Sequence, residues 1–562
     1  MENLNQKIKK QRKLMLIVPP SFDLDLVEEK NNRIDWLLQS LSIPHGPISI
    51  AAYVQKNSRY DVDVRIIDLN LEVVKYQESA SNGRKRLFGR EGILFSDIEQ
   101  FQPDIIGLSA IFSINYKYIS LFLDSLPISA GETPIIMGGG AAWNLQASIL
   151  KEYPRIHAIC IGEGEIPVLD LVDSDDYYHE LETNVSFITV LGIQHNKLPK
   201  ARFVQNLDDI PFGDDRFVDV DEYFHFANKR LLDKTMQKEQ VRSMSIFTSR
   251  GCPFHCIFCT NGSVHGKTVR YMTADRVMED IMQMVKTHHI NLLCIEDDLF
   301  LHDQSRAKDI LNRIAQLNLS IRIEFPNGVP VYGINDEIAG AMRQAGVSAV
   351  SLGVESGSDH VLQHIIRKPL KADMVVGAVK SLRRFAIGVQ FFIVTGFPSE
   401  TKVHRQETIN LILEAGIDWA HIFIATPLIG SELYKLCEEK GYLVSASSDI
   451  FLLTTATIHT PDFTPEEIED AAYKMNLEVN FIKNYNYSVG NYEVALAYFQ
   501  NVYEKYPDHA IVCYCMYLCY MQLKNDAESR IFLRRFQDIV HESEYWRKYA
   551  DYFHLQSEDG GC

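Results

Sequence analysis

Residues 249–260 read Ser249-Arg-Gly-Cys-Pro-Phe-His-Cys-Ile-Phe-Cys-Thr260 and place three cysteines in the spacing C-x3-C-x2-C, directly after an apolar run at 244–248. The thiolates of Cys252, Cys256 and Cys259 can ligate three irons of a 4Fe-4S cube, because soft sulfur ligands in a tight loop suit such clusters. The fourth iron then lacks a protein ligand. An open metal position is where a small molecule can coordinate and react, so the spacing predicts a catalytic cluster.

Two other interpretations of the cysteine stretch stay open. A structural zinc loop normally needs a fourth cysteine or histidine and two C-x2-C pairs. His255 lies inside the stretch, but it directly precedes Cys256 and is poorly placed to complete a tetrahedron. The three thiols could also be unrelated, although their spacing favours a shared cluster.

The sequence around the cysteines alternates between strand and helix patterns from residue 243 to about residue 443, which predicts a partial (β/α) barrel of the TIM type. Active-site residues of such a barrel lie in the loops that follow the strands. Loops follow the apolar runs 292–295, 349–353, 389–394 and 422–424, and they read Glu296-Asp-Asp298, Val354-Glu-Ser-Gly-Ser358, Thr395-Gly-Phe-Pro-Ser-Glu-Thr401 and Ala425-Thr-Pro-Leu-Ile-Gly-Ser431.

The cysteine spacing and these four motifs, in this order, resemble the radical S-adenosylmethionine (SAM) superfamily. The resemblance implies that SAM binds the open iron and is cleaved reductively to a 5'-deoxyadenosyl radical. It implies that Phe258 packs near the adenine of SAM and that Glu296 and Asp297 hold its ammonium group, since a carboxylate is a sensible acceptor for a cation. Glu355 would lie near the ribose and methionyl groups, and Gly396 would permit a close backbone approach. The alternative for each acid is a solvated loop charge or a helix cap.

The first 200 residues repeat the alternation of short apolar runs and amphipathic segments, which predicts a Rossmann-like α/β domain with a parallel sheet at residues 13–200. The expected strands are 14–18, 62–67, 105–109, 134–137 and 158–161. Loops rich in Gly, Ser, Asp or Pro follow each of them. Ligands of open α/β sheets bind at the carboxyl ends of the strands, so these loops predict a second binding site.

The order of those loops resembles the cobalamin-binding domain that precedes many radical SAM cores. The resemblance rests on Ser42-Ile-Pro-His-Gly-Pro-Ile-Ser-Ile-Ala-Ala52, Pro103-Asp-Ile-Ile-Gly-Leu-Ser109, Gly138-Gly-Gly140 and Gly162-Glu-Gly-Glu165. It implies that cobalamin contacts Ser109 and Glu163. It also implies that the backbone of Gly138, Gly139 and Gly140 approaches the corrin and its nucleotide tail.

Two departures from that pattern concern the lower face of the cobalt. The D-x-H-x-x-G motif, which supplies a histidine ligand in other cobalamin proteins, is absent. Gly-Gly-Gly-Ala-Ala142 stands where relatives often carry Gly-Gly-Pro-His. The cobalt would therefore lack a histidine ligand, or the domain has lost cobalamin.

The remaining segments connect and extend these two domains. Residues 201–242 are loop-like and charged, which predicts a linker, and the barrel is expected at 243–450. Residues 451–562 are expected to be all helical. Within them, residues 488–555 resemble a tetratricopeptide repeat, since a pattern that starts at Gly490 restarts 34 residues later at Lys524. So few repeats favour a helical cap over an independent binding surface.

The composition limits the partners. The chain has 562 residues and a net charge of -18, with an isoelectric point near 5.5. An acidic surface disfavours nucleic acid, and no run is long enough for a signal peptide or a membrane helix. We therefore expect a cytoplasmic enzyme with a small-molecule or peptide substrate. A reducing electron donor of the flavodoxin or ferredoxin type would serve it.

The resemblance as a whole implies a cobalamin-dependent radical SAM enzyme that methylates an unactivated carbon or a phosphinate phosphorus. A second interpretation keeps the radical but has no methyl transfer, giving a cyclisation, rearrangement or oxidation. A third makes the chain a cluster-bearing scaffold that works through its C-terminal repeat. A methylthiotransferase is disfavoured, because only Cys160 precedes the motif and the acidic charge does not suit tRNA.

Overall fold

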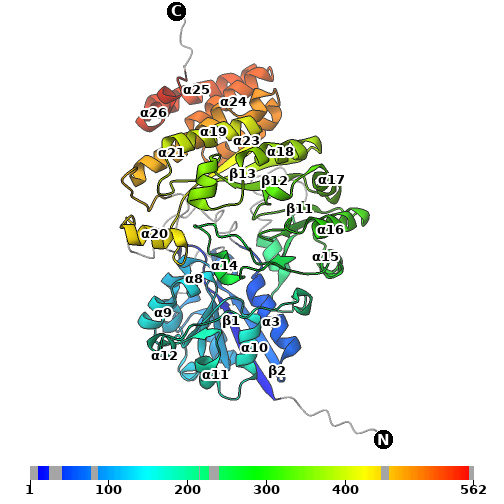
Figure 1. The fold of residues 1–562 in the computed structure, drawn as a ribbon, viewed down its shortest axis with the longest axis vertical. Helices are drawn as coiled ribbons and strands as arrows, with labels where there is room; N and C mark the ends of the chain where they lie inside the picture. Colours follow the sequence, from blue (N-terminus) through cyan, green and yellow to red (C-terminus); the bar gives the residue numbers. More distant parts are fainter. Residues whose placement is uncertain are drawn as a thin grey trace, which may run out of the picture.

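The computed structural model describes residues 10–24, 41–77, 86–213, 216–226, 240–444 and 455–555. These residues form three parts that follow one another along the long axis of the molecule. Figure 1 shows the first domain (blue to cyan) at one end, a curved array of strands and helices (green to yellow) in the middle, and a helical part (orange to red) at the other end.

The first domain is built on a six-stranded sheet with the strand order β2-β1-β3-β4-β5-β6. Its strands are β1 (Gln11–Val18), β2 (Asp61–Asp68), β3 (Ile105–Ser109), β4 (Ile135–Gly138), β5 (Ala158–Cys160) and β6 (Phe187–Ile188). Only β6 is antiparallel to its neighbour. The order of the first five strands is doubly wound, and its direction reverses between β1 and β3, which is where such sheets bind ligands.

Helices cover both faces of this sheet. The side chains of Leu14 and Leu16 belong to one buried cluster and those of Met15 and Ile17 to another, as expected of a buried parallel strand. The helices are α3 (His45–Asn57), α4 (Leu69–Gln77), α6 (Ile93–Phe101), α7 (Ile119–Asp124), α8 (Gly140–Asn144), α9 (Gln146–Glu152), α10 (Glu165–Asp173), α11 (Tyr177–Thr183) and α12 (Val190–Gln194).

The middle part is a six-stranded partial barrel. Its strands are β7 (Ser243–Ile246), β10 (Leu292–Ile295), β11 (Arg322–Glu324), β12 (Ala349–Glu355), β13 (Gly388–Thr395) and β14 (Trp419–Ile424). They form two parallel three-stranded sheets, β7-β10-β11 and β12-β13-β14. Parallel bridges from Ile323 to Val347 and from Val329 to Leu352 join the two. A short hairpin of β8 (Ser249–Arg250) and β9 (Arg270–Tyr271) stands beside the first strand.

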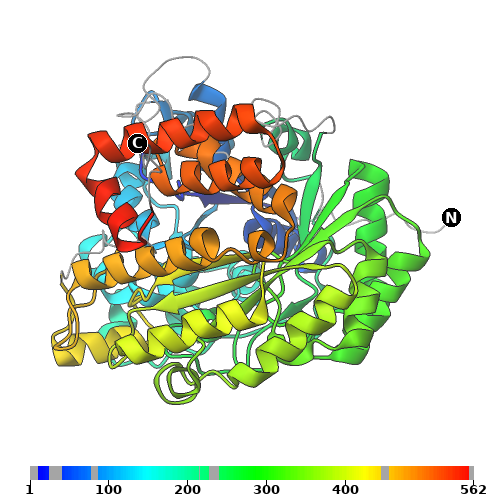
Figure 2. The same ribbon diagram turned by 90° about the horizontal axis from the view of Figure 1, so that it is seen from above.

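A helix follows most of the barrel strands, and polar side chains begin several of these helices. The helices are α14 (Asn261–Val264), α15 (Ala274–His288), α16 (Gln304–Gln316), α17 (Asp336–Ala345), the π-helical turn η5 (Val361–Ile366), α18 (Ala372–Arg384), α19 (Lys402–Ala415) and α20 (Glu432–Lys440). Thr273, Asp303 and Asn335 accept hydrogen bonds from the first turns of α15, α16 and α17, as N-cap residues do. In Figure 2 the green to yellow helices form an outer row along the strands.

The interior of the barrel is open to solvent on the β13 side. Val389, Phe391 and Ile393 are fully buried, whereas the alternate residues Gln390 and Phe392 are only half-buried. Successive side chains of a strand point to opposite faces, so the fully buried set packs against the helices. The half-buried set therefore faces the barrel interior and keeps some exposure to solvent there.

The C-terminal helices close one edge of the barrel. They are α21 (Pro465–Leu477), the π-helical turn η6 (Glu478–Ile482), α22 (Tyr485–Ser488), α23 (Tyr492–Lys505), α24 (Ala510–Gln522), α25 (Asp526–Glu542) and α26 (Glu544–Tyr552). The buried side chain of Asn480 accepts a hydrogen bond from the Ala420 N–H and donates one to the Ala420 carbonyl, both at 2.7 Å. This amide therefore stands where a further strand would pair with the edge strand β14.

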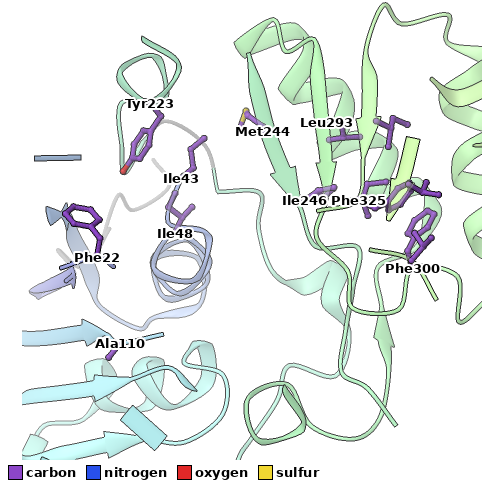
Figure 3. Packing of buried hydrophobic residues seen from close by; sticks show 14 of the residues in the cluster. Phe22, Ile43, Ile48, Ala110, Tyr223, Met244, Ile246, Leu293, Phe300 and Phe325 are labelled. Atoms are coloured by element: carbon purple, nitrogen blue, oxygen red, sulfur yellow. The ribbon is translucent and has the colours of Figure 1, made fainter. Parts of the chain in front are cut away.

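A continuous apolar core joins the first domain to the barrel through the expected linker. The same buried cluster contains Ile48 of the first domain, Leu207 and Tyr223 of the linker region, and Leu293 of the barrel. Figure 3 shows Tyr223 close to Ile43 and Ile48, and Met244, Ile246 and Phe325 within the barrel. The described part of residues 201–242 is thus not merely a spacer, because its apolar residues are packed on both sides.

The α/β fold and the helical C-terminal region are confirmed. Two barrel features escaped the sequence patterns: β11, whose middle residue alone is buried, and the hairpin β8–β9. None of the described helices has the length and apolar character needed to cross a membrane. The last residues of the expected helical extension, 556–562, lie outside the described residues.

Candidate functional site

The three cysteines lie in the loop that leaves β8 and enters α14, at the carboxyl ends of the barrel strands. Two backbone hydrogen bonds pin the middle of this loop: the Ile257 N–H donates to the Ile366 carbonyl at 3.1 Å, and the Leu433 N–H donates to the Ile257 carbonyl at 2.8 Å. The end of η5 and the start of α20 therefore hold the loop from two sides. Cys252 and Cys256 are half-buried, and Cys259 is exposed.

The three thiols share one electrostatic environment. Burial raises the pKa of Cys256 to about 12, the nearby Lys368 ammonium opposes this, and the other two thiols add to it. Such thiols stay protonated until a metal displaces their protons. The Asn261 N–H points at the Cys259 sulfur at 3.4 Å, as amides do toward cluster sulfurs. These donors fit three corners of a cube.

A site for a single metal ion is not formed by the described residues: no group of three or more His, Cys, Asp or Glu side chains converges on one point. His255 is exposed and does not join the thiols. The zinc interpretation therefore lacks its ligand set, whereas ligands of separate irons in a cube need not converge on one centre.

Glu355 and Lys368 form an ion pair beside the cysteines. Lys368 Nζ lies 2.8 Å from Glu355 Oε1 and donates to the Gly353 carbonyl at 2.6 Å. Glu355 has a φ of 65°, and the register of β12 against β13 shifts between Gly353 and Glu355. A bulge with a left-handed residue re-aims a side chain at the end of a strand; besides burial, the Glu355 charge helps to raise the pKa of Cys256 and Cys259. The sequence patterns missed Lys368.

The two acids after β10 have different environments. Glu296 is half-buried, accepts a hydrogen bond from Ser245 Oγ at 3.0 Å, and has a pKa raised by burial. Asp297 is only 1% exposed. Its carboxylate accepts hydrogen bonds from the Thr248 N–H and from the Thr248 and Ser249 hydroxyls. Asp297 therefore holds the chain ahead of the cysteines, and its contact with SAM stays a prediction.

The loop after β13 lies next to the last two cysteines. Phe258 packs against the fully buried Phe397, with ring centroids 5.9 Å apart. Gly396 has a φ of 91°, and a Cβ there would lie 2.8 Å from Ile468. Its N–H donates to the buried carboxylate of Glu400. Gly396 is therefore required by the packing of α21 onto this loop, in addition to any close approach of a ligand.

The carboxyl edge of the first sheet gathers the loops that the sequence singled out. Asn70 binds the Ser21 N–H at 2.8 Å, and Asn115 donates to the Pro20 carbonyl at 2.7 Å. Ser109 ends β3 and pairs with Gly138. In the loop after β3, Ile111 and Phe112 are 54% and 55% exposed. Two exposed apolar side chains at the switch point fit a large, partly apolar ligand.

The glycines of this edge are crowded by protein. Gly139 has a φ of 101°, and a Cβ there would lie 2.4 Å from the Ala110 carbonyl oxygen. A Cβ on Gly140 would meet the side chain of Val264 in α14 at 3.5 Å. Figure 1 shows α14 and α8 side by side at the junction of the two domains. The three-glycine loop thus brings the first domain against the helix that follows the cysteines.

Glu163 does not point to an open site. Its buried carboxylate binds Arg270 through two hydrogen bonds, at 2.6 and 2.9 Å, and His265 at 2.9 Å. Both oxygens of Glu163 are thus engaged by the barrel, and its contact with cobalamin stays a prediction. The sequence patterns missed Arg250 and Arg270, although Arg250 stands two residues before Cys252.

Comparison with known proteins identifies the middle part. Residues 246–412 match the model of the Radical SAM superfamily. An uncharacterized methyltransferase of Pyrococcus horikoshii is 27% identical over 465 residues, which cover 82% of this chain and 90% of that protein. The cytidylyl-2-hydroxyethylphosphonate methyltransferase of Streptomyces wedmorensis is 26% identical over 480 residues, covering 79% and 87%.

Two solved structures share the fold. OxsB, a cobalamin-dependent S-adenosylmethionine radical enzyme with aqua-cobalamin and S-adenosylmethionine bound, matches 96% of this chain and 80% of its own, with a TM-score of 0.60 and 14% identity. The radical S-adenosylmethionine methyltransferase TsrM from Kitasatospora setae, with cobalamin and a [4Fe-4S] cluster bound, matches 82% and 85%, with a TM-score of 0.58 and 13% identity.

Proposed function

We propose that this chain, a radical SAM enzyme by its domain at residues 246–412, is a cobalamin-dependent methyltransferase of a small molecule or peptide. One observation carries the proposal: α14 begins two residues after Cys259 and contacts α8, which begins in the three-glycine loop of the first sheet. The three thiols, which leave the fourth iron of a cluster without a protein ligand, therefore lie next to the ligand-binding edge of a doubly wound sheet. Two cofactor sites would meet at this junction. Cofactors that act on the same substrate must be held close to each other.

Each cofactor has residues suited to it. Cys252, Cys256 and Cys259 would hold the cluster, and Glu296, Glu355 and Phe258 would surround SAM. Ser109, Gly138 and the exposed Ile111 and Phe112 would border cobalamin. When bound, the cluster with SAM supplies a 5'-deoxyadenosyl radical and cobalamin supplies a methyl group.

The chain's own residues would orient these groups and the substrate. Lys368 neutralises Glu355 beside the thiols, so the site does not add an uncompensated negative charge to an anionic cluster. Phe392, His421 and Phe423 line the open barrel interior, with the His421 and Phe392 rings 5.5 Å apart. Burial lowers the pKa of His421, so this wall is neutral and aromatic. We infer that the substrate occupies this interior.

Anaerobic reconstitution tests the proposal. The full chain is incubated with iron, sulfide and hydroxocobalamin and desalted, and its spectrum and metal content are measured. We expect about four irons and one cobalt per chain. With SAM and a reductant, such a chain should release 5'-deoxyadenosine. Iron without cobalt would refute the cobalamin part and leave a radical enzyme without methyl transfer.

Cysteine variants make the cluster assignment specific. Cys256→Ala should lose most of the bound iron and all release of 5'-deoxyadenosine, because a cube cannot be held by two thiolates. Cys513→Ala is the matched control: Cys513 is a buried thiol of α24, far along the chain, and its loss should leave the iron content unchanged. Equal iron in the two variants would contradict the assignment.

Two further parts of the proposal concern partners. Reductive cleavage of SAM needs an electron donor, and we propose one of the flavodoxin or ferredoxin type, which would approach the cluster at the exposed Cys259. We also propose that α23 to α26 form a tetratricopeptide-like cap. Trp419 of β14 stacks on Tyr498 of α23 with centroids 5.5 Å apart, which supports a capping role over a scaffold that works alone.

A further inference from the structure

A buried ionic network links the first domain to the cysteine loop. Glu163 comes from the loop after β5 and Glu165 begins α10, whereas Arg250 and Arg270 come from the paired strands β8 and β9. Arg270 binds both oxygens of Glu163. Arg250 Nη1 lies 2.8 Å from Glu165 Oε1 and 3.4 Å from Glu163 Oε2. Two carboxylates and two guanidinium groups thus balance in charge.

Further contacts satisfy the rest of the network. Ser49 Oγ donates to Glu165 at 2.6 Å and accepts from Arg250 at 3.1 Å. Arg270 also donates to the Val204 carbonyl at 2.7 Å and lies over the Phe203 ring. The network therefore gathers α3, the β5 loop and residues 203 and 204 around one hairpin.

Burial makes the geometry of this network strict. Glu163, Glu165 and Arg270 are each less than 10% exposed. Paired buried charges are tolerated only in well-formed geometry, and removal of one partner leaves the other without compensation. Bidentate Arg–carboxylate pairs also fix direction as well as distance. Such a network holds the first domain and the barrel in one relative position. An apolar contact fixes the relative position less strictly, because it has no preferred direction.

The network lies between the cysteine loop and the carboxyl edge of the first sheet. Arg250 is two residues before Cys252, and the hairpin it belongs to frames the cysteine loop, since the Cys252 N–H donates to the Gly266 carbonyl at 3.2 Å. Glu163 lies three residues after the end of β5, on the carboxyl edge of the first sheet. A shift of the hairpin against Glu163 would therefore move the cysteines relative to that edge.

We propose that Glu163, Glu165, Arg250 and Arg270 form an interdomain latch that sets the separation between the cysteine loop and the carboxyl edge of the first sheet. We assign them as positioning residues, because their charged groups bind one another across the junction. The latch rests on the proposed function for its catalytic consequence: it would keep radical formation coupled to methyl transfer. Reactions between two held groups are sensitive to displacements of about 1 Å.

Glu163→Gln tests the latch, because it removes one charge and keeps the size of the side chain. In the reconstituted full chain we expect the ratio of 5'-deoxyadenosine to methylated product to rise about tenfold. A misplacement of about 1 Å would slow methyl transfer by at least that factor. Asp175→Asn is the matched control, since Asp175 forms an exposed pair with Arg59 at 3.0 Å in the same domain. That variant should keep the parent ratio. A folded Glu163→Gln chain whose ratio stays within twofold of the parent would overturn the latch.

A second measurement needs no cofactor and no methyl transfer. Hydrogen–deuterium exchange of the cofactor-free full chain should be faster in the hairpin of β8 and β9 for Glu163→Gln than for the parent and Asp175→Asn. If the parent makes no methylated product, the proposed function fails and this exchange alone decides the latch: an unchanged exchange rate of the hairpin overturns it. Should Glu163→Gln not fold, Arg270→Lys keeps the charge but loses the bidentate pair, and the same two measurements apply.

Discussion

Asp297 shows how one buried carboxylate organises the start of the cysteine loop. Its carboxylate accepts hydrogen bonds from the Thr248 N–H, the Thr248 hydroxyl and the Ser249 hydroxyl. Three donors on one carboxylate fix the direction in which the chain leaves β7, and hence where Cys252 begins. Glu296, one residue earlier, keeps a half-buried carboxylate with a single serine donor. The two neighbouring acids thus differ in their hydrogen-bond partners and in their burial.

Gly139 carries a prediction at the same scale. Gly139→Ala should lower the stability of the first domain by at least about 2 kcal/mol, since its backbone conformation is reserved for glycine and a Cβ would clash with the Ala110 carbonyl. Gly377→Ala is the opposite case: Gly377 lies in α18 with free space around it, and a helical alanine should add up to about 1 kcal/mol. Thermal unfolding of both variants checks the pair. A similar melting temperature for the two would contradict the crowding at Gly139.

At the scale of the element, strand β13 separates a packed face from an open one. Phe391→Ala should cost about 4 kcal/mol, because Phe391 is fully buried against the helices. Phe392→Ala should cost about 2 kcal/mol or less, because Phe392 faces the barrel interior and is only partly buried. Thermal unfolding compares these adjacent phenylalanines directly. Equal losses would mean that the barrel interior is filled.

Strands with uniform or alternating apolar patterns could be predicted from the sequence. The runs 105–109 and 292–295 coincide with β3 and β10. Strand β11 could not be predicted, because only Ile323 of its three residues is buried. This strand is defined by its pairing with β10, which is distant in the sequence. Among site residues, the cysteines follow from local spacing. The role of Arg270 does not follow from local spacing, because its partner Glu163 is 107 residues away in the sequence. Local sequence carries no signal of such a pair.

At the scale of the whole molecule, the latch ties the contact between domains to the charge of Glu163. Burial disfavours the charged form, but hydrogen bonds from His265 and Arg270 and the charges of both arginines prevail, and they lower the pKa of Glu163 from 4.5 to about 2. A carboxyl group with a lowered native pKa stabilises the fold above its unfolded pKa. This stability is lost as the pH falls toward the native pKa.

Glu163→Gln should therefore be less stable than the parent by about 3 kcal/mol at pH 5 to 8, as a shift of this size implies. The difference should shrink as the pH falls below about 4.5, where the unfolded parent begins to take up the proton. Melting temperatures of the two chains across this range provide the measurement. A difference that grows toward acid pH would contradict the assignment of the charge to Glu163.

The amide of Asn480 has a consequence for how the chain is made. It closes the border of β14 from 60 residues further along the sequence. At translation rates of about 5–20 residues per second, the finished barrel waits about 3–12 s for that amide. During this interval the strand offers its N–H and C=O groups to any passing chain. Synthesis of this protein thus contains a short period of vulnerability to mispairing, which ends only when the turn after α21 has emerged from the ribosome.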